Sequence, residues 1–102
     1  MKTALGVDLG ATWLRLCLCD GRKELWAAKT AAVAWRELPG FLQRHLRKHG
    51  QRRVGALTVG GTRLGDAKDR AALRRSLAPL ASRVRILPDF EIAHLAAFGR
   101  GP

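Results

Sequence analysis

The sequence predicts an α/β fold in which a mixed sheet of five strands is flanked by helices. Near the N-terminus, an apolar run and a glycine turn lead into a stretch where apolar residues alternate with others. Further along, two short apolar runs alternate with three stretches of helical periodicity. A chain of 102 residues is long enough for one modest core, so we expect a single domain over residues 1–102.

Residues 4–21 predict a buried strand, a tight turn and a second strand that runs back. Val7 and Leu9 lie in the apolar run, which is followed by Gly10. Because glycine has no Cβ, we expect a positive φ at Gly10, with backbone N–H groups presented to a bound anion. Asp8 lies beside this turn, where a carboxylate is suited to hold a hydrated magnesium ion.

Residues 25–30 predict a third strand, which completes an antiparallel meander after the turn at Asp20 and Gly21. Residues 35–49 predict an amphipathic helix, since apolar side chains recur at three- and four-residue spacing. Gly50 is the expected stop of this helix, and Pro39 is tolerable only in its first turn.

The second half of the chain predicts a strand over residues 54–59, then a loop containing Gly60, Gly61 and Gly65. Residues 68–81 predict a helix whose end is frayed by Pro79. A fifth strand over 84–87 and a last helix over 91–98 complete the order.

This order predicts a ribonuclease H-like arrangement. Strand–helix–strand units form right-handed parallel crossovers, so the first, fourth and fifth strands are expected to be parallel, with the meander on one side. Asp8, the pair Gly60 and Gly61, and Asp89 then all lie at carboxyl ends of parallel strands. Open α/β sheets bind their ligands at that edge.

The chain is strongly basic, with 19 Lys and Arg against 8 Asp and Glu, a net charge of +11. This balance favours phosphate-bearing partners of any kind. The densest run, residues 45–53, has no interleaved aromatic residues and is interpreted as a solvated helix end. No apolar run is long enough to cross a membrane, and we expect a cytoplasmic protein.

A pair of cysteines and a pair of histidines could each bind a metal ion, but a structural role is the favoured interpretation of both pairs. Cys17 and Cys19 lie two apart on one strand and are interpreted as reduced core residues, because no recognised set of further ligands accompanies them. His45 and His49 are four apart on one helix face, a spacing that can chelate a metal. Packing or solvation at the helix edge is the favoured interpretation, since the H-E-x-x-H pattern is absent.

The run D-L-G-A-T at residues 8–12 resembles the first phosphate-binding motif of the sugar kinase, heat-shock and actin-like ATPase superfamily. The likeness is greatest to N-acetylglucosamine kinases and BadF/BadG/BcrA/BcrD-type ATPases, because two further motifs recur at suitable distances. These are Gly60-Gly61-Thr62 and Asp89. The resemblance covers nearly the whole chain but only the first lobe of the family's fold.

This resemblance implies an ATP-dependent kinase lobe with magnesium and a sugar or amino-sugar substrate. It assigns phosphate binding to Asp8, Gly10, Ala11 and Thr12, with magnesium held by Asp8 through water. It places Gly60, Gly61 and Thr62 at the sugar, with Asp89 as a substrate contact and the catalytic base. Structural alternatives stay open: Asp8 and the glycines as turn residues, Thr12 as a strand starter, and Asp89 as a helix N-cap.

The sequence departs from the family pattern in four respects. Ala11 replaces the second glycine of the usual turn, Trp13 replaces a polar or basic residue, and Pro88 replaces a Thr or Asn. The family's second phosphate motif and adenosine pocket are not found within these 102 residues. We therefore expect an N-terminal lobe that is inactive alone and that associates with itself or a second lobe through Ile92, Leu95 and Phe98.

A magnesium-dependent resolvase-type nuclease is the alternative function. It would use Asp8, Asp89 and Glu91 around metal ions, and the charge of +11 would attract DNA. This function is less favoured, because such nucleases need a further late carboxylate that the sequence does not supply. A non-catalytic interaction domain with the same fold is a third possibility.

Overall fold

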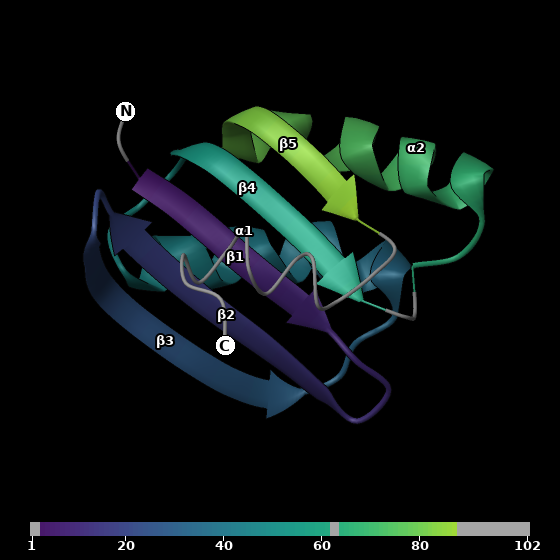
Figure 1. Ribbon diagram of the computed structural model, residues 1–102, viewed down its shortest axis with the longest axis horizontal. Helices are drawn as coiled ribbons and strands as arrows, with labels where there is room; N and C mark the ends of the chain where they lie inside the picture. The colour runs from purple at the N-terminus through teal and green to yellow at the C-terminus, as the bar shows by residue number, and fades with distance from the viewer. Residues whose placement is uncertain (1–2, 62–63, 88–102) are drawn as a thin grey trace.

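The computed structural model describes residues 3–61 and 64–87. Five strands form one sheet in the order β3-β2-β1-β4-β5 (Figure 1). The elements, in chain order, are β1 (Thr3–Leu9), β2 (Trp13–Asp20), β3 (Lys23–Ala31), the 3₁₀ helix η1 (Trp35–Glu37), α1 (Leu38–Lys48), β4 (Val54–Gly61), α2 (Ala67–Leu77), the 3₁₀ helix η2 (Ala78–Leu80) and β5 (Ala81–Leu87).

The predicted sheet topology is confirmed. β1 pairs antiparallel with β2, and β2 with β3, which makes the meander. β4 runs parallel to both β1 and β5, so α1 and α2 are crossover helices. Both helices lie on the same face of the sheet, behind it in Figure 1.

The core lies between this face and the two helices. Alternate residues of the strands are buried there, and in the register of the sheet Leu5, Leu18 and Leu57 lie side by side, as do Val7, Leu16 and Val59. Leu38, Leu42 and Leu46 from α1 and Leu73 and Leu77 from α2 pack in the same cluster. The other strand residues, Asp8 and Arg15 among them, therefore belong to the opposite face.

Local signals in the sequence account for most element ends. Gly21 joins β2 to β3 with a φ of 63°, and Gly50 ends α1 with a φ of 74°. Pro39 lies in the first turn of α1, where its missing N–H breaks no helical bond. At the start of α2, the side chains of Asp66 and Asp69 each accept a hydrogen bond from the other residue's backbone N–H.

Several predicted boundaries are wrong. β4 continues through Gly60 and Gly61, which had been expected in a loop, because both residues are held in register with β1. The second helix ends at Leu77, and β5 begins at Ala81 rather than at residue 84. Pro79 lies in η2 between them, where it cannot continue the α-helix. The first predicted helix begins as η1 before α1.

The last predicted helix, over 91–98, lies outside the described residues, and so do Thr62, Pro88, Asp89 and Glu91. The proposed association surface of Ile92, Leu95 and Phe98 is likewise outside them. Among the described residues, no helix is long and apolar enough to cross a membrane.

Candidate phosphate-binding site

The carboxyl ends of β1 and β4 meet at one edge of the sheet. Asp8 is in register with Gly60, and Leu9 with Gly61. On its other side Asp8 is in register with Arg15 of β2, on the sheet face away from the helices. Asp8 is half-buried there. The structure thus brings together the predicted phosphate residue and the predicted glycine pair, while Thr62 and Asp89 lie outside the described residues.

Gly61 has a structural reason to be glycine. Its φ of 148° is one that other residues rarely adopt, and a Cβ at this position would collide with the backbone carbonyl of Leu9. The end of β4 therefore approaches the end of β1 more closely than a side chain at residue 61 would allow. Contact of this glycine with a ligand stays a prediction.

The turn between β1 and β2 corrects the expectation for Gly10. The φ of Gly10 is not positive, and its N–H donates a hydrogen bond to the carbonyl of Trp13 with an N···O distance of 3.0 Å. Gly10 and Trp13 thus close a two-residue turn, and a Cβ on Gly10 would lie 3.3 Å from the same carbonyl oxygen. Because this N–H already has a partner, it is not the donor that an anion would use.

The two central residues of the turn are the better anion donors. Ala11 and Thr12 are exposed, and within the described part of the chain their amide N–H groups make no hydrogen bond. The carbonyl of Thr12 accepts a hydrogen bond from the N–H of Ala32 at 2.9 Å, which ties the turn to the end of β3. Two neighbouring free amides on a fixed turn can bind a phosphate oxygen.

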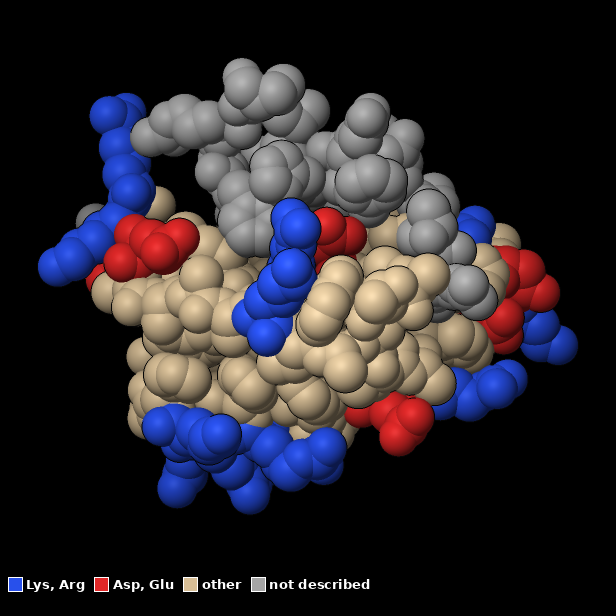
Figure 2. All heavy atoms as spheres, turned by 90° about the horizontal axis from the view of Figure 1, so that it is seen from below, with Lys and Arg blue, Asp and Glu red and all other residues tan. Residues whose placement is uncertain are grey.

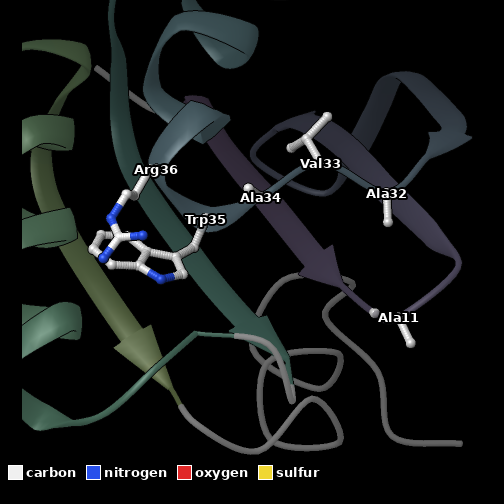
Figure 3. A pocket seen from close by; sticks show the side chains of 7 residues that line it. Ala11, Ala32, Val33, Ala34, Trp35 and Arg36 are labelled. Carbon is white, nitrogen blue, oxygen red and sulfur yellow. The ribbon is translucent and has the colours of Figure 1, made fainter.

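A pocket of about 400 Å³ opens where this turn meets the segment after β3 (Figure 3). Its walls are made by residues from these two segments: Gly10, Ala11, Ala32, Val33, Ala34, Trp35 and Arg36. In Figure 3 the Trp35 and Arg36 side chains lie together on one side of the pocket, and Ala11 and Ala32 lie on the other. The Arg36 guanidinium carbon is 4.8 Å from the centroid of the Trp35 ring.

Sequence reasoning missed Arg36. The residue stands next to Glu37 at the start of a helix, and nothing in its local pattern separates it from the other arginines. Its place at the pocket depends on the hydrogen bond between Ala32 and Thr12, a contact between segments that are twenty residues apart. Arg36 gives the pocket a cation, which favours a negatively charged ligand.

Trp13 is a second feature of the turn's surroundings. Its side chain is 49% exposed, and the Lys29 ammonium lies 4.5 Å from the ring centroid. The large ring therefore stands on the surface beside the turn.

The cysteine and histidine pairs lie away from this edge. The Cys17 and Cys19 sulfurs are 3.6 Å apart, and the Cys17 thiol donates to a Glu24 carboxylate oxygen at 3.5 Å. His45 stacks on Phe41, and His49 stacks on Trp26 with 4.1 Å between ring centroids. Among the described residues, no three His, Cys, Asp or Glu side chains are grouped to hold a metal.

Comparison with known proteins gives the fold. No family model matches the sequence. A search of the curated proteins also gave no match. Among solved structures, a putative N-acetylglucosamine kinase from Porphyromonas gingivalis superposes with a TM-score of 0.64 and 24% identity, over 97% of this chain and 38% of its own. The chain has the fold of the N-terminal lobe of a sugar kinase.

Two further kinases agree. The ROK hexokinase from Thermus thermophilus gives a TM-score of 0.62 at 20% identity, over 94% of this chain and 38% of its own. A putative N-acetylglucosamine kinase from Chromobacterium violaceum gives a TM-score of 0.59 at 23% identity, over 97% of this chain and 39% of its own. The sugar kinase-like lobe thus spans a little over a third of the length of these structures, and none of the three is named as a nuclease.

Proposed function

We propose that this chain is the phosphate- and sugar-binding lobe of an ATP-dependent sugar kinase of the N-acetylglucosamine kinase or BadF type. The observation that carries the proposal is the turn of residues 10–13, whose Ala11 and Thr12 amides make no hydrogen bond within the described residues. The turn follows β1, in which Asp8 is in register with Gly60 and Leu9 with Gly61. The sugar-kinase lobe fold supports it, because this turn has the sequence that resembles the superfamily's phosphate motif.

The residues of the turn fit a magnesium-bound phosphate. Asp8 offers the hard carboxylate oxygens that magnesium prefers, and we assign it the ion through a water molecule. The amides of Ala11 and Thr12 and the Thr12 hydroxyl are donors for phosphate oxygens, and Arg36 supplies a positive charge across the pocket. Magnesium, when bound, would neutralise part of the charge on the nucleotide phosphates.

The sugar side of the site would be formed by Gly60, Gly61 and Thr62, with Asp89 next to the reacting hydroxyl. In this assignment Asp89 accepts the hydroxyl proton as the sugar oxygen bonds to the γ-phosphorus of ATP and the bond to ADP breaks. A second lobe, in the same or another polypeptide, would hold the nucleoside. We assign the protein to the cytoplasm, where ATP and sugars are available.

The proposal is tested with the 102-residue chain by two-dimensional amide NMR during titration with ATP, with and without magnesium. We expect weak binding, with saturable shifts at the amides of Ala11, Thr12 and their neighbours, strengthened by magnesium. Asp8→Asn should remove the magnesium effect, because the negative charge that attracts the hydrated ion is lost. Asp20→Asn, an exposed carboxylate at the far end of β2, is the matched control and should leave the titration unchanged.

Three results would overturn this function. The first is the absence of any shift at the turn when the nucleotide is at 20 times the concentration of the chain. The second is an equal magnesium effect on the shifts in wild type and Asp8→Asn. The third is magnesium-dependent cleavage of duplex or branched DNA by the purified chain, which would establish the nuclease alternative instead.

A further inference from the structure

A second pocket lies at the opposite end of the sheet from the turn of residues 10–13. It has a volume of about 610 Å³ and is formed by the end of α1, the segment before β4, and η2. Its walls are Gln43, Arg47, Gly50, Gln51, Arg52, Pro79 and Leu80. The eight residues of β4 separate it from the β4 glycine pair by roughly 20 Å. This pocket, called here the α1-end pocket, is therefore independent of the proposed kinase site.

The backbone at the end of α1 brings two arginines to this pocket. The Gln51 N–H donates to the Leu46 carbonyl at 2.8 Å, and the Gly50 N–H donates to the Arg47 carbonyl at 3.1 Å. With Gly50 in the left-handed region, this is a Schellman motif, which reverses the chain direction at the helix end. The reversal places Arg52 at the same pocket as Arg47, from outside the helix.

The charge around the α1-end pocket is of one sign. The sequence has no Asp or Glu between Glu37 and Asp66, and the pocket wall has none. Arg47 and Arg52 are exposed, and within the described part of the chain neither makes an ion pair or a side-chain hydrogen bond. Arg53 differs, because its guanidinium donates to the Ala81 carbonyl at 3.2 Å and so has a structural partner.

Figure 2 shows a group of basic side chains on the surface. Lys and Arg side chains gather at the lower left of that view, on the side where the helices lie in Figure 1, and an acidic group lies farther right along the same edge. The exposed cations of α1 are Arg44, Arg47 and Lys48. Attraction to the negative end of the helix dipole explains Arg47 and Lys48 but not Arg52, which lies beyond the helix.

The lining indicates the class of ligand. Two guanidinium groups offer paired donors that match phosphate oxygens, and the Gln43 and Gln51 carboxamides can bind hydroxyl groups. The pocket has a volume typical of small-molecule sites. No aromatic side chain lines it, so it lacks the stacking platform that single-stranded nucleic acids use. We propose that the α1-end pocket is a binding site for a small phosphomonoester, held by Arg47 and Arg52.

The test is a titration of the 102-residue chain, at constant ionic strength, with inorganic phosphate and with glucose 6-phosphate. Amide and arginine side-chain NMR signals give the affinity and the location. We expect saturable shifts at residues 50–52 and at the side chains of Arg47 and Arg52. Arg47→Gln and Arg52→Gln should each weaken binding at least five-fold, because each removes one charged fork. Arg83→Gln, an exposed arginine on β5 outside the pocket wall, is the matched control.

The proposal fails if the shifts do not saturate, if sodium chloride produces the same shifts, or if Arg83→Gln weakens binding as much as the pocket variants. It also fails if a duplex or single-stranded oligonucleotide binds at α1 and cannot be displaced by glucose 6-phosphate. That result would identify the basic surface as a nucleic-acid interface. Shifts at residues 10–13 report on the kinase site, so the two proposals succeed or fail separately.

Discussion

His45 is held in a ring stack in which protonation is disfavoured. It stacks on Phe41 with 5.0 Å between centroids and contacts Trp26 at 5.9 Å. Burial, followed by the positive charges of Lys48 and His49, lowers the pKa of His45 below its ordinary value of 6.5. The unfolded chain therefore binds the proton more readily than the folded chain.

Stability should accordingly depend on pH through this residue. The contribution is fully present above pH 6.5 and is lost as the pH falls from there through the lower pKa of the folded state. We expect urea unfolding between pH 7.5 and 5 to show a smaller loss of stability in His45→Phe, which keeps a ring but does not titrate. Ser76→Ala, on the exposed side of α2, leaves the His45 ring and its packing unchanged and should retain the wild-type slope. Equal slopes in His45→Phe and wild type would contradict this account.

Cys17 is a protected thiol despite its close neighbour. Burial raises its pKa to about 12, and the Cys19 and Glu24 side chains act in the same direction. At pH 8 the reactive thiolate is then on the order of one part in ten thousand. We expect iodoacetamide to modify Cys17 at least 100-fold more slowly in the folded chain than in urea, as followed by mass spectrometry. Modification at equal rates would show that the thiol is not held in this state.

The close approach of β4 to β1 depends on one glycine. In Gly61→Ala, the new methyl group would meet the Leu9 carbonyl, so the strands must separate at the edge that carries Asp8. We expect a loss of about 1–3 kcal/mol in the free energy of unfolding. Gly40→Ala is the control: the new Cβ would lie 3.4 Å from an Arg44 nitrogen at the end of a flexible side chain, inside α1. It should be neutral or stabilise the chain by about 0.5–1 kcal/mol.

The first turn of α2 depends on a reciprocal cap. The Asp66 carboxylate accepts the Asp69 N–H at 2.8 Å, and the Asp69 carboxylate accepts the Asp66 N–H at 3.2 Å. Asp66→Ala should cost about 1 kcal/mol in urea unfolding, because one helix N–H loses its partner. Asp66→Asn keeps an oxygen acceptor and should lose only part of this. If both variants unfold alike, the cap contributes nothing beyond charge.

Elements with a strong internal pattern were the ones that the sequence could predict. Alternating leucines in β2 fix which residues face the helices, and Gly50 marks the end of α1 because only glycine readily adopts its φ. Gly60 and Gly61 were placed in a loop, since their extended pairing depends on Asp8 and Leu9, more than fifty residues away. The same limit applies to Gly10. That this residue is a glycine does not by itself predict that its N–H bonds to the carbonyl of Trp13.

The candidate sites likewise contain features that the sequence predicts and features that it does not. The carboxylate and turn of the candidate phosphate-binding site could be predicted, because the end of a parallel strand fixes the sheet edge at which Asp8 lies. Arg36 and the α1-end pocket could not, because each arises where segments distant in sequence meet. The cations of residues 45–53 were expected as a solvated helix end, and only the chain reversal at Gly50 brings two of them to one pocket.

At the scale of the whole molecule, turnover should require a second lobe. The turn of residues 10–13 is exposed and forms one wall of a site, so we expect no ADP release from ATP with sugars when the 102-residue chain is assayed alone. A protein that joins it to a second lobe should transfer phosphate. Asp89→Asn should abolish that transfer while nucleotide binding persists, because the variant removes a proton acceptor. Transfer that survives Asp89→Asn would exclude Asp89 as the base.

Among the described strands, β3 and β5 lie at the two borders of the sheet, where a further strand could pair with their backbone groups. Both borders carry exposed cations: Lys23 and Lys29 on β3, and Arg83 and Arg85 on β5. Glu24 is also exposed on β3, so only the β5 border has exposed charges of one sign. A β5 strand of a second copy would bring like charges together there, and we expect this repulsion to oppose extension of the sheet. Because salt screens the repulsion, we expect any association through β5 to increase with salt concentration.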